Sequence, residues 1–222
     1  MMRSTEDWIS QYQEKGAFWL HDGNPKRPHA LLTRGKHSSG FFDSELVMED
    51  SILLDEATSD LVLLLQKRDI NLNNVDRVLG PSMGAITLAH DISRHIGHNC
   101  FNHVLRAYAE KETNGNSKTM VFKRTVIRTG EHVLVVDDVL TTGDSVGLTV
   151  TAVINAGGIV MPFIAVLVNR SGLKEVDGRK IIALIDHSMP KWMPVECPLC
   201  KEGSEAIRPK EMENWARLNA SY

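Results

Sequence analysis

Residues 133–145, VLVVDDVLTTGDS, constrain the fold more than any other part of the chain. The four apolar residues that open this segment predict a central strand of a parallel sheet, because such a strand is buried on both faces. Two acids follow the strand directly. A Thr-Thr-Gly turn then leads into a predicted helix over residues 145–155, which Gly157 and Gly158 end. A strand, a glycine turn and a helix in this order predict an α/β fold.

The same order of elements recurs along the chain. The predicted strands cover residues 75–79, 99–107, 133–136, 159–168 and 180–185, and the predicted helices cover residues 50–67, 85–96 and 145–155. Strands that alternate with helices predict a central parallel sheet flanked by helices. Ligands of such sheets bind at the carboxyl ends of the strands. Residues 109–119 are polar and rich in Gly and Asn, which predicts a mobile loop or hairpin tip.

We expect the chain to divide into three parts. Residues 1–48 predict an N-terminal helix followed by a small hood of strands and loops, residues 49–187 the α/β core, and residues 188–222 a tail. A length of 222 residues suits one α/β domain with a small appendage.

Composition excludes several classes of protein. The formal net charge of −3 lacks the clustered excess of Lys and Arg that nucleic-acid binding requires. No apolar run approaches the roughly 18 residues that a membrane span needs. Three cysteines are too few for a disulfide framework, and the N-terminal residues do not resemble a signal peptide. We therefore expect a cytoplasmic protein with a small-molecule substrate.

The residue types of the central segment, residues 133–145, indicate what kind of ligand it can bind. Asp137 and Asp138 emerge at the end of the strand, where carboxylates can accept hydrogen bonds from vicinal sugar hydroxyls. The loop that follows opens a helix, so its backbone N–H groups and hydroxyls can cradle a phosphate, and Gly143 allows a close approach of the backbone. The predicted phosphate-binding residues are Thr141, Thr142, Gly143, Asp144 and Ser145. Together these features predict a ribose 5-phosphate ligand.

This segment resembles, along its whole length, the signature with which type I phosphoribosyltransferases bind 5-phosphoribosyl-1-pyrophosphate (PRPP). The resemblance implies the fold of that family and a reaction in which a base displaces pyrophosphate from PRPP. It also implies that Asp137 and Asp138 are catalytic. They would orient the ribose and a Mg²⁺ cofactor that substrate and water largely hold.

Residues 80–84, GPSMG, resemble the pyrophosphate loop of the same family. Exposed amides of such a loop bind the leaving pyrophosphate. The resemblance implies pyrophosphate binding by Ser82, Met83 and Gly84, together with Arg106 from the strand that follows.

The polar residues before the PRPP segment resemble the flexible catalytic loop of the family, which closes over the reacting atoms. Lys111 corresponds to a catalytic lysine of that loop. Lys118, Lys123 and Arg124 are further bases of the same stretch. The family resemblance also implies a homodimer, in which loop residues reach the partner's site.

The hood is similar to the start of orotate phosphoribosyltransferases, the members of the family that this chain resembles most. Arg34, Phe41 and Phe42 lie in the similar stretch, and Arg170 corresponds to an arginine that binds the orotate carboxylate. The resemblance implies that PRPP and orotate give orotidine 5′-monophosphate and pyrophosphate, a step of pyrimidine biosynthesis. Two alternatives are a phosphoribosyltransferase for a purine or another base, and a non-catalytic sensor of PRPP or nucleotides.

The tail contains Cys197-Pro-Leu-Cys200. Such a pair supplies two of the four ligands of a zinc site, which Cys100, His187 or a second copy of the chain could complete. A redox pair would lack its usual βαβ setting. The third interpretation is a turn with two half-buried thiols, and the sequence leaves these alternatives open.

Overall fold

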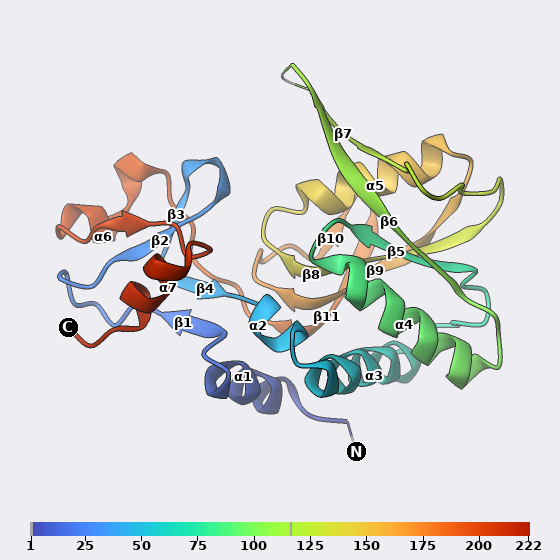
Figure 1. The fold of residues 1–222 in the computed structure, drawn as a ribbon, viewed down its shortest axis with the longest axis horizontal. Helices are drawn as coiled ribbons and strands as arrows, with labels where there is room; N and C mark the ends of the chain where they lie inside the picture. The colour runs from blue at the N-terminus through green and yellow to red at the C-terminus, as the bar shows by residue number, and fades with distance from the viewer. Residues whose placement is uncertain (1, 116) are drawn as a thin grey trace.

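The computed structural model describes residues 2–115 and 117–222. A seven-stranded sheet forms the larger part of the molecule, and a smaller part built from short strands lies beside it (Figure 1). The sheet has the strand order β10-β11-β9-β8-β5-β6-β7. Its strands are β5 (Arg77–Pro81), β6 (Leu105–Asn114), β7 (Ser117–Val121), β8 (His132–Leu140), β9 (Ile159–Asn169), β10 (Glu175–Val176) and β11 (Arg179–Asp186). The five inner strands pair in parallel, and the two edge strands pair antiparallel, so the predicted fold class is confirmed.

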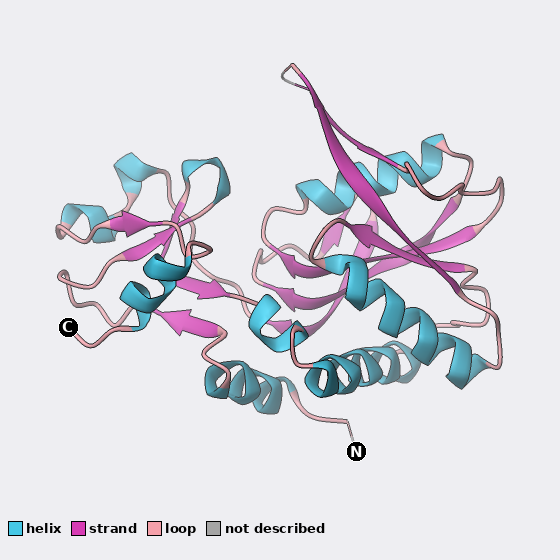
Figure 2. Cartoon of the chain, in the orientation of Figure 1, coloured by secondary structure: helices cyan, strands magenta, loops and turns pink. Residues whose placement is uncertain are grey.

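The apolar run of β8 divides its side chains between two cores. Leu134 and Val136 pack into the core beneath α3 (Ser51–Lys67) and α4 (Ala85–Cys100). Val133 and Val135 pack on the opposite face, in the core beneath α5 (Asp144–Asn155). Successive side chains of a strand alternate between faces, so an uninterrupted apolar run is what a sheet covered by helices on both faces requires (Figure 2).

Residues from both ends of the chain build the smaller part. Its elements are β1 (Phe18–Leu20), β2 (His29–Leu31), a 3₁₀ turn (Thr33–Gly35), β3 (His37–Ser38) and β4 (Gly40–Phe42), and from the tail a 3₁₀ turn (Pro194–Glu196), α6 (Pro198–Lys201), β12 (Ala206–Ile207) and α7 (Met212–Asn219). The N-terminal helices α1 (Thr5–Glu14) and α2 (Glu45–Met48) pack instead into the larger core, through Trp8 and Tyr12 and through Val47 and Met48. Strand β12 pairs in parallel with β2. A separate apolar core joins Trp19 and Phe41 to Ile207 and Leu218, so the tail completes the hood. The division of the chain at residues 48 and 187 stays a prediction.

Several predicted boundaries differ from the structure. β8 continues past Val136 to Leu140, so Asp137 and Asp138 lie within the strand and not after it. The strand expected at residues 75–79 covers residues 77–81. The strand expected at residues 99–107 begins only at Leu105, because α4 continues to Cys100 and ends at Phe101, whose φ of 51° is left-handed. The predicted turn at residues 80–84 is shorter, since Gly80 and Pro81 still pair with β6. The hairpin expected at residues 109–119 is present as β6 and β7, with residue 116 outside the described residues. Among the described residues, no helix has both the length and the hydropathy to cross a bilayer.

Candidate active site

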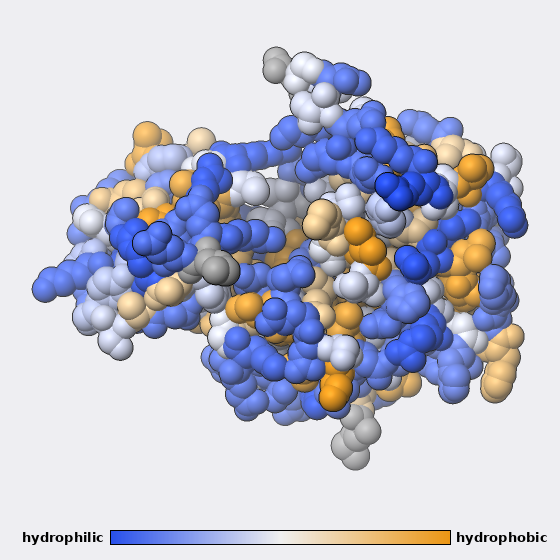
Figure 3. All heavy atoms as spheres, viewed as in Figure 1, coloured by the Kyte–Doolittle hydropathy of each residue, from blue (hydrophilic) through white to orange (hydrophobic). Residues whose placement is uncertain are grey.

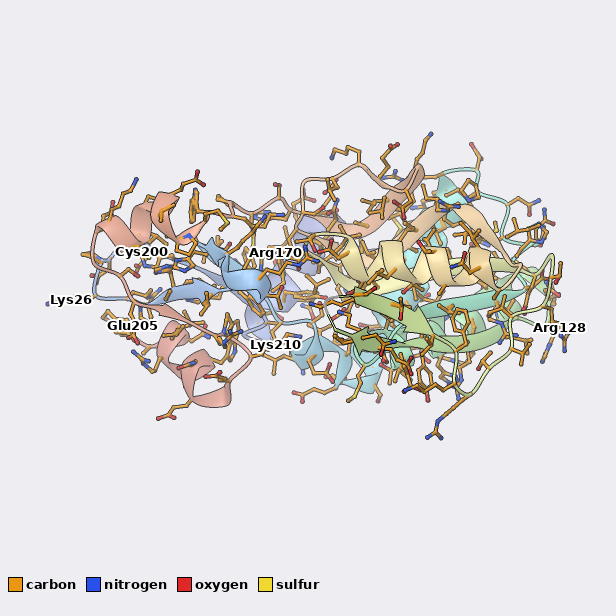
Figure 4. All side chains as sticks on the ribbon, turned by 90° about the horizontal axis from the view of Figure 1, so that it is seen from above. Lys26, Arg128, Arg170, Cys200, Glu205 and Lys210 are labelled. Carbon is orange, nitrogen blue, oxygen red and sulfur yellow. The ribbon has the colours of Figure 1, made fainter. Side chains whose placement is uncertain are left out.

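A cavity of about 410 Å³ lies at the carboxyl ends of β5 and β8, where the core meets the hood and the tail. The core contributes Asp137, Asp138 and the loop after β5, the hood contributes Phe41, and the tail contributes Lys210. The view from above shows Arg170 and Lys210 near the junction between the two parts (Figure 4). The space-filling view, on which hydrophilic side chains dominate, is hollowed between the parts (Figure 3). Three segments that are distant in sequence thus form one site.

Asp137 and Asp138 stand where β8 leaves the apolar interior. Asp137 is only 9% exposed, and the backbone N–H of Asp138 donates to its Oδ1 at 3.1 Å. Burial, with the negative charge of Asp138 next in size, raises the pKa of Asp137 well above its usual range. Lys210 is the nearby positive charge that opposes this rise. An approaching cation or hydroxyl donor therefore meets a carboxylate whose charge is poorly compensated.

The loop after β8 leads directly into α5. Gly143, the residue before the helix, has a left-handed φ of 80°, and a Cβ there would come within 2.9 Å of Val176. The first backbone N–H groups of a helix have no intrahelical acceptor, and Thr141 and Ser145 line the cavity beside them. The Lys191 ammonium donates to the carbonyl of Thr141 at 2.8 Å, which fixes the start of the loop.

The same loop separates the cavity from a second, more open hollow. Thr142, Gly143 and Asp144 line this hollow of about 680 Å³, together with Arg34 and Lys118. The carboxylate of Asp144 accepts a hydrogen bond from Thr142 and lies 3.1 Å from the guanidinium of Arg34. The structure therefore places Arg34 beside the predicted phosphate loop and not on the cavity that Arg170 lines.

The turn after β5 contacts the acids of β8. A Cβ on Gly84 would approach Oδ2 of Asp138 to 3.0 Å. The backbone N–H of Ser82 donates to Ala109, while the Met83 side chain is 83% exposed. Ser82, Met83 and Gly84 all line the cavity, so the predicted pyrophosphate loop and the predicted ribose-binding acids lie together.

Arg106 and Lys111 do not line this cavity in their own chain. Arg106 is an exposed residue of β6, whose backbone carbonyl accepts from Arg77. Lys111 is exposed and pairs with Met120 within the β6–β7 hairpin, which projects away from the body of the molecule (Figure 1).

Arg170 is buried in the wall between core and hood. Its side chain donates to Ser38 Oγ at 2.9 Å and to the carbonyl of Gly40 at 2.8 Å, and it lies over the ring of Phe41. Its Nε has no partner, and no carboxylate lies within 4.0 Å of its guanidinium in residues 2–115 or 117–222. Burial lowers the pKa of Arg170 to about 10, so it stays charged at neutral pH.

The two aromatic residues predicted to cover the base have different surroundings. Phe42 stacks on Phe18 with ring centroids 4.6 Å apart and packs edge-on against Tyr12, so it also belongs to the core. Phe41 lies between Arg170 and Trp215. Both rings reach the cavity.

Sequence reasoning missed the contribution of the tail. Arg208 and Lys210 line the cavity, and Lys191 supports the loop at Thr141. The only signal in the sequence was two bases around a proline, RPK, in a segment that ends far from the motif of β8. Pairing of β12 with β2 brings these bases to the site.

The fold and this cavity define the class of protein. Residues 63–197 match the model of the phosphoribosyl transferase domain, and the chain belongs to the phosphoribosyltransferase family, whose members are pentosyltransferases. Within that family its relatives include orotate phosphoribosyltransferases. It is 35% identical over 182 residues to the enzyme of Heliobacterium modesticaldum, covering 82% of this chain and 88% of the relative. It is 35% identical over 181 residues to that of Desulforamulus reducens, covering 82% and 87%.

Solved structures agree on the fold. Orotate phosphoribosyltransferase from Aeropyrum pernix aligns with a TM-score of 0.56 at 23% identity, covering 79% of this chain and 91% of that chain. Adenine phosphoribosyltransferase from Saccharomyces cerevisiae aligns with a TM-score of 0.55 at 16% identity, covering 80% and 99%. Similarity at these identities shows a shared fold alone. The identity of the base must be argued from the chemistry of the site.

Proposed function

We propose that this phosphoribosyltransferase joins orotate to PRPP, giving orotidine 5′-monophosphate and pyrophosphate. The observation that carries the proposal is Arg170, a buried cation on the cavity wall to which the described part of the chain offers no carboxylate partner. A buried charge is costly unless an opposite charge compensates it. Orotate differs from uracil by one carboxylate, which is the group that Arg170 would pair with.

In the proposed reaction, a ring nitrogen of orotate bonds to C1 of PRPP as the bond from C1 to the pyrophosphate oxygen breaks. The pyrophosphate leaves with the electron pair of that bond. The attacking nitrogen of orotate gives up its N–H proton to water and reaches C1 as an anion, and the site acts through positioning and charge stabilisation. Asp137 and Asp138 would accept hydrogen bonds from the ribose hydroxyls, and the loop from Thr141 to Ser145 would hold the 5′-phosphate.

The leaving group would be bound on the opposite side of the ribose. We assign it to Ser82, Met83 and Gly84, whose turn faces Asp138. Arg106 and Lys111 would add positive charge. Because Lys111 lies on a projecting hairpin and not on its own cavity, we propose that it acts in the site of the partner subunit of a homodimer.

The donor set at Asp137 and Asp138 fits Mg²⁺, which prefers carboxylate and phosphate oxygens. The raised pKa of Asp137 reflects a carboxylate that a cation would stabilise. Bound there, the ion would neutralise charge on the pyrophosphate. Phe41, beside Arg170, would cover one face of the base, with Phe42 behind it.

Release of pyrophosphate from PRPP and Mg²⁺, measured with orotate, uracil, adenine, guanine and hypoxanthine in turn, tests the proposal. Uracil is the matched control, because it lacks only the carboxylate. Release with orotate and none with uracil supports both the reaction and the role of Arg170. Release with a purine contradicts the assignment of the base. PRPP binding without release for any base would identify a non-catalytic sensor.

A further inference from the structure

Four metal-binding side chains meet inside the hood, away from the cavity. They are His29 of β2, His37 of β3, and Cys197 and Cys200 at the start of α6. Their ligand atoms all lie within 4.8 Å of one another. His29 and Cys197 are fully buried, and Cys200 is half-buried. In Figure 4, Cys200 lies in the hood at one end of the molecule and Arg128 lies at the opposite end of the core, with Arg170 between them.

The spacing of these atoms matches the edges of a tetrahedral zinc site. With Zn–S of about 2.3 Å and Zn–N of about 2.0 Å, a tetrahedron has S···N edges of roughly 3.5 Å and an N···N edge of roughly 3.3 Å. His29 Nε2 lies 3.5 Å from each of the two sulfurs. His37 Nδ1 lies 3.2 Å from Cys200 Sγ and 2.9 Å from His29 Nε2. Shifts of a few tenths of an ångström would suffice to form the ideal polyhedron.

Hydrogen bonding around His29 leaves the correct nitrogen free for a metal. Ser204 uses its only hydroxyl proton to donate to the carbonyl of Arg27 at 2.7 Å. Its oxygen, 2.8 Å from His29 Nδ1, must therefore accept from that nitrogen. The proton of the neutral imidazole then sits on Nδ1, and the lone pair of Nε2 points at the two sulfurs. An outer hydrogen bond of this kind orients the ring in metal sites.

We propose that His29, His37, Cys197 and Cys200 bind one Zn²⁺ as a structural site. Two thiolates and two imidazoles in a tetrahedral arrangement are a ligand set that zinc favours. All four positions belong to the protein, so the site has no open position for a substrate. The structure thus supplies two ligands that the C-x-x-C pair lacks, from histidines 8 residues apart. Cys100, at the end of α4, and His187, which packs against Phe18, are not part of the cluster.

The proposed ion would cross-link the tail to the hood at the edge of the active site. Its ligands come from two distant segments, since Cys197 follows His29 by 168 residues and Cys200 follows it by 171. From His29 the chain runs directly into Leu31 and Leu32, and from Cys200 it runs on to Arg208 and Lys210, all on the cavity wall. This role does not depend on which base the enzyme uses.

The metal content of the full-length protein tests the inference directly. The chain is expressed in zinc-supplemented medium and purified without chelators or metal-affinity steps. Elemental analysis should then find about one Zn²⁺ per chain, as a single four-ligand site requires. The variant C197S/C200S should contain none, and C100S, the matched control, should contain as much as the wild type. Wild-type protein without zinc, which also takes up none on titration, would overturn the proposal.

A second measurement stays decisive if the double variant does not fold. X-ray absorption of the zinc-loaded wild type should show two sulfurs at about 2.3 Å and two nitrogens at about 2.0 Å. Replacement by Co²⁺ should give the intense visible bands of a tetrahedral thiolate complex. A metal coordinated only by oxygen and nitrogen, in either experiment, would show that Cys197 and Cys200 do not bind it.

Discussion

At the scale of single residues, Arg170 combines deep burial with an uncompensated positive charge. Two hydrogen bonds to the hood, to Ser38 and to Gly40, fix its Nη2, while its Nε remains without a partner. An arginine held rigidly in this way recognises a planar anion without a large loss of side-chain entropy. Discrimination between orotate and uracil should therefore depend on this one side chain.

We predict that Arg170→Ala raises the KM for orotate about ten- to a hundredfold, because a hydrogen bond to a charged group contributes about 1.5–3 kcal/mol. The KM for PRPP should change far less. Arg128→Ala, at an exposed position at the other end of the molecule, is the control and should behave as wild type. Steady-state kinetics with each substrate varied in turn measure the effect. An unchanged KM for orotate would show that Arg170 does not bind the carboxylate.

We expect Asp137 to lower the stability of the folded protein at neutral pH while it contributes to activity. Its pKa in the folded protein is raised above the ordinary 3.8, so folding favours the protonated form, and the stability that this form contributes is lost as the pH rises toward the folded-state pKa. Asp137→Asn removes the buried charge. The variant should be more stable than the ligand-free wild type at neutral pH, by about 0.5–2 kcal/mol.

The extra stability of Asp137→Asn should shrink at pH values below the ordinary carboxyl pKa, because position 137 is then uncharged in both proteins. Thermal unfolding of both proteins across this range of pH tests the sign, and a variant less stable than wild type at neutral pH would contradict it.

Turnover of Asp137→Asn with Asp138→Asn should fall by about 10²-fold or more, as expected when groups that orient the reacting centre are lost.

At the scale of elements, the close packing of β5 against the start of α4 and against β8 depends on the absence of a side chain at Gly80. A Cβ there would lie 2.3 Å from Cβ of Ala85 and 2.9 Å from the carbonyl of Val136. Gly80→Ala should therefore destabilise the protein by about 1–3 kcal/mol, as overpacking does. Denaturant unfolding measures the loss. Adding Ala85→Gly removes the nearest clash and should recover part of it, whereas strictly additive effects would contradict this origin of the strain.

Elements with a strong local pattern could be predicted from the sequence. The run from Val133 to Val136, followed by two acids and a glycine, identified β8, its loop and α5. The helix predicted from residue 50 is α3, which begins after its N-cap Asp50, whose carboxylate accepts hydrogen bonds from the backbone N–H groups of Ile52 and Leu53. Such features depend only on neighbouring residues, which is why one sequence suffices to find them.

Elements defined by distant contacts could not be predicted in the same way. The end of α4 was misplaced, because Phe101 adopts a left-handed cap that glycine or asparagine usually provides. His29 and His37 had no pattern that linked them to Cys197, since their proximity follows from the pairing of β2 with β12 and β3. For the same reason Lys210 was not assigned to the active site.

At the scale of the whole molecule, the projecting β6–β7 hairpin predicts that subunits share active sites. Lys111→Ala and the double variant Asp137→Asn with Asp138→Asn should each be inactive. Mixing and reassembling them in equal amounts should restore about a quarter of wild-type activity, because half of the dimers are mixed and each of these has one intact site. Wild type mixed with itself is the control. A mixture as inactive as its components would show that Lys111 acts in its own subunit or not at all.

The pairing of β2 with β12 also sets the order in which the protein can become active during its synthesis. The ribosome makes β2 early, but its parallel partner β12 is made much later. Ala206, which pairs with His29, is added 177 residues after it. At bacterial or eukaryotic rates of translation this is a delay on the order of ten seconds or more. A nascent chain that already carries the sheet and Asp137 has an open site without Lys210. The lining of the cavity is therefore complete only in a chain whose synthesis has passed Lys210.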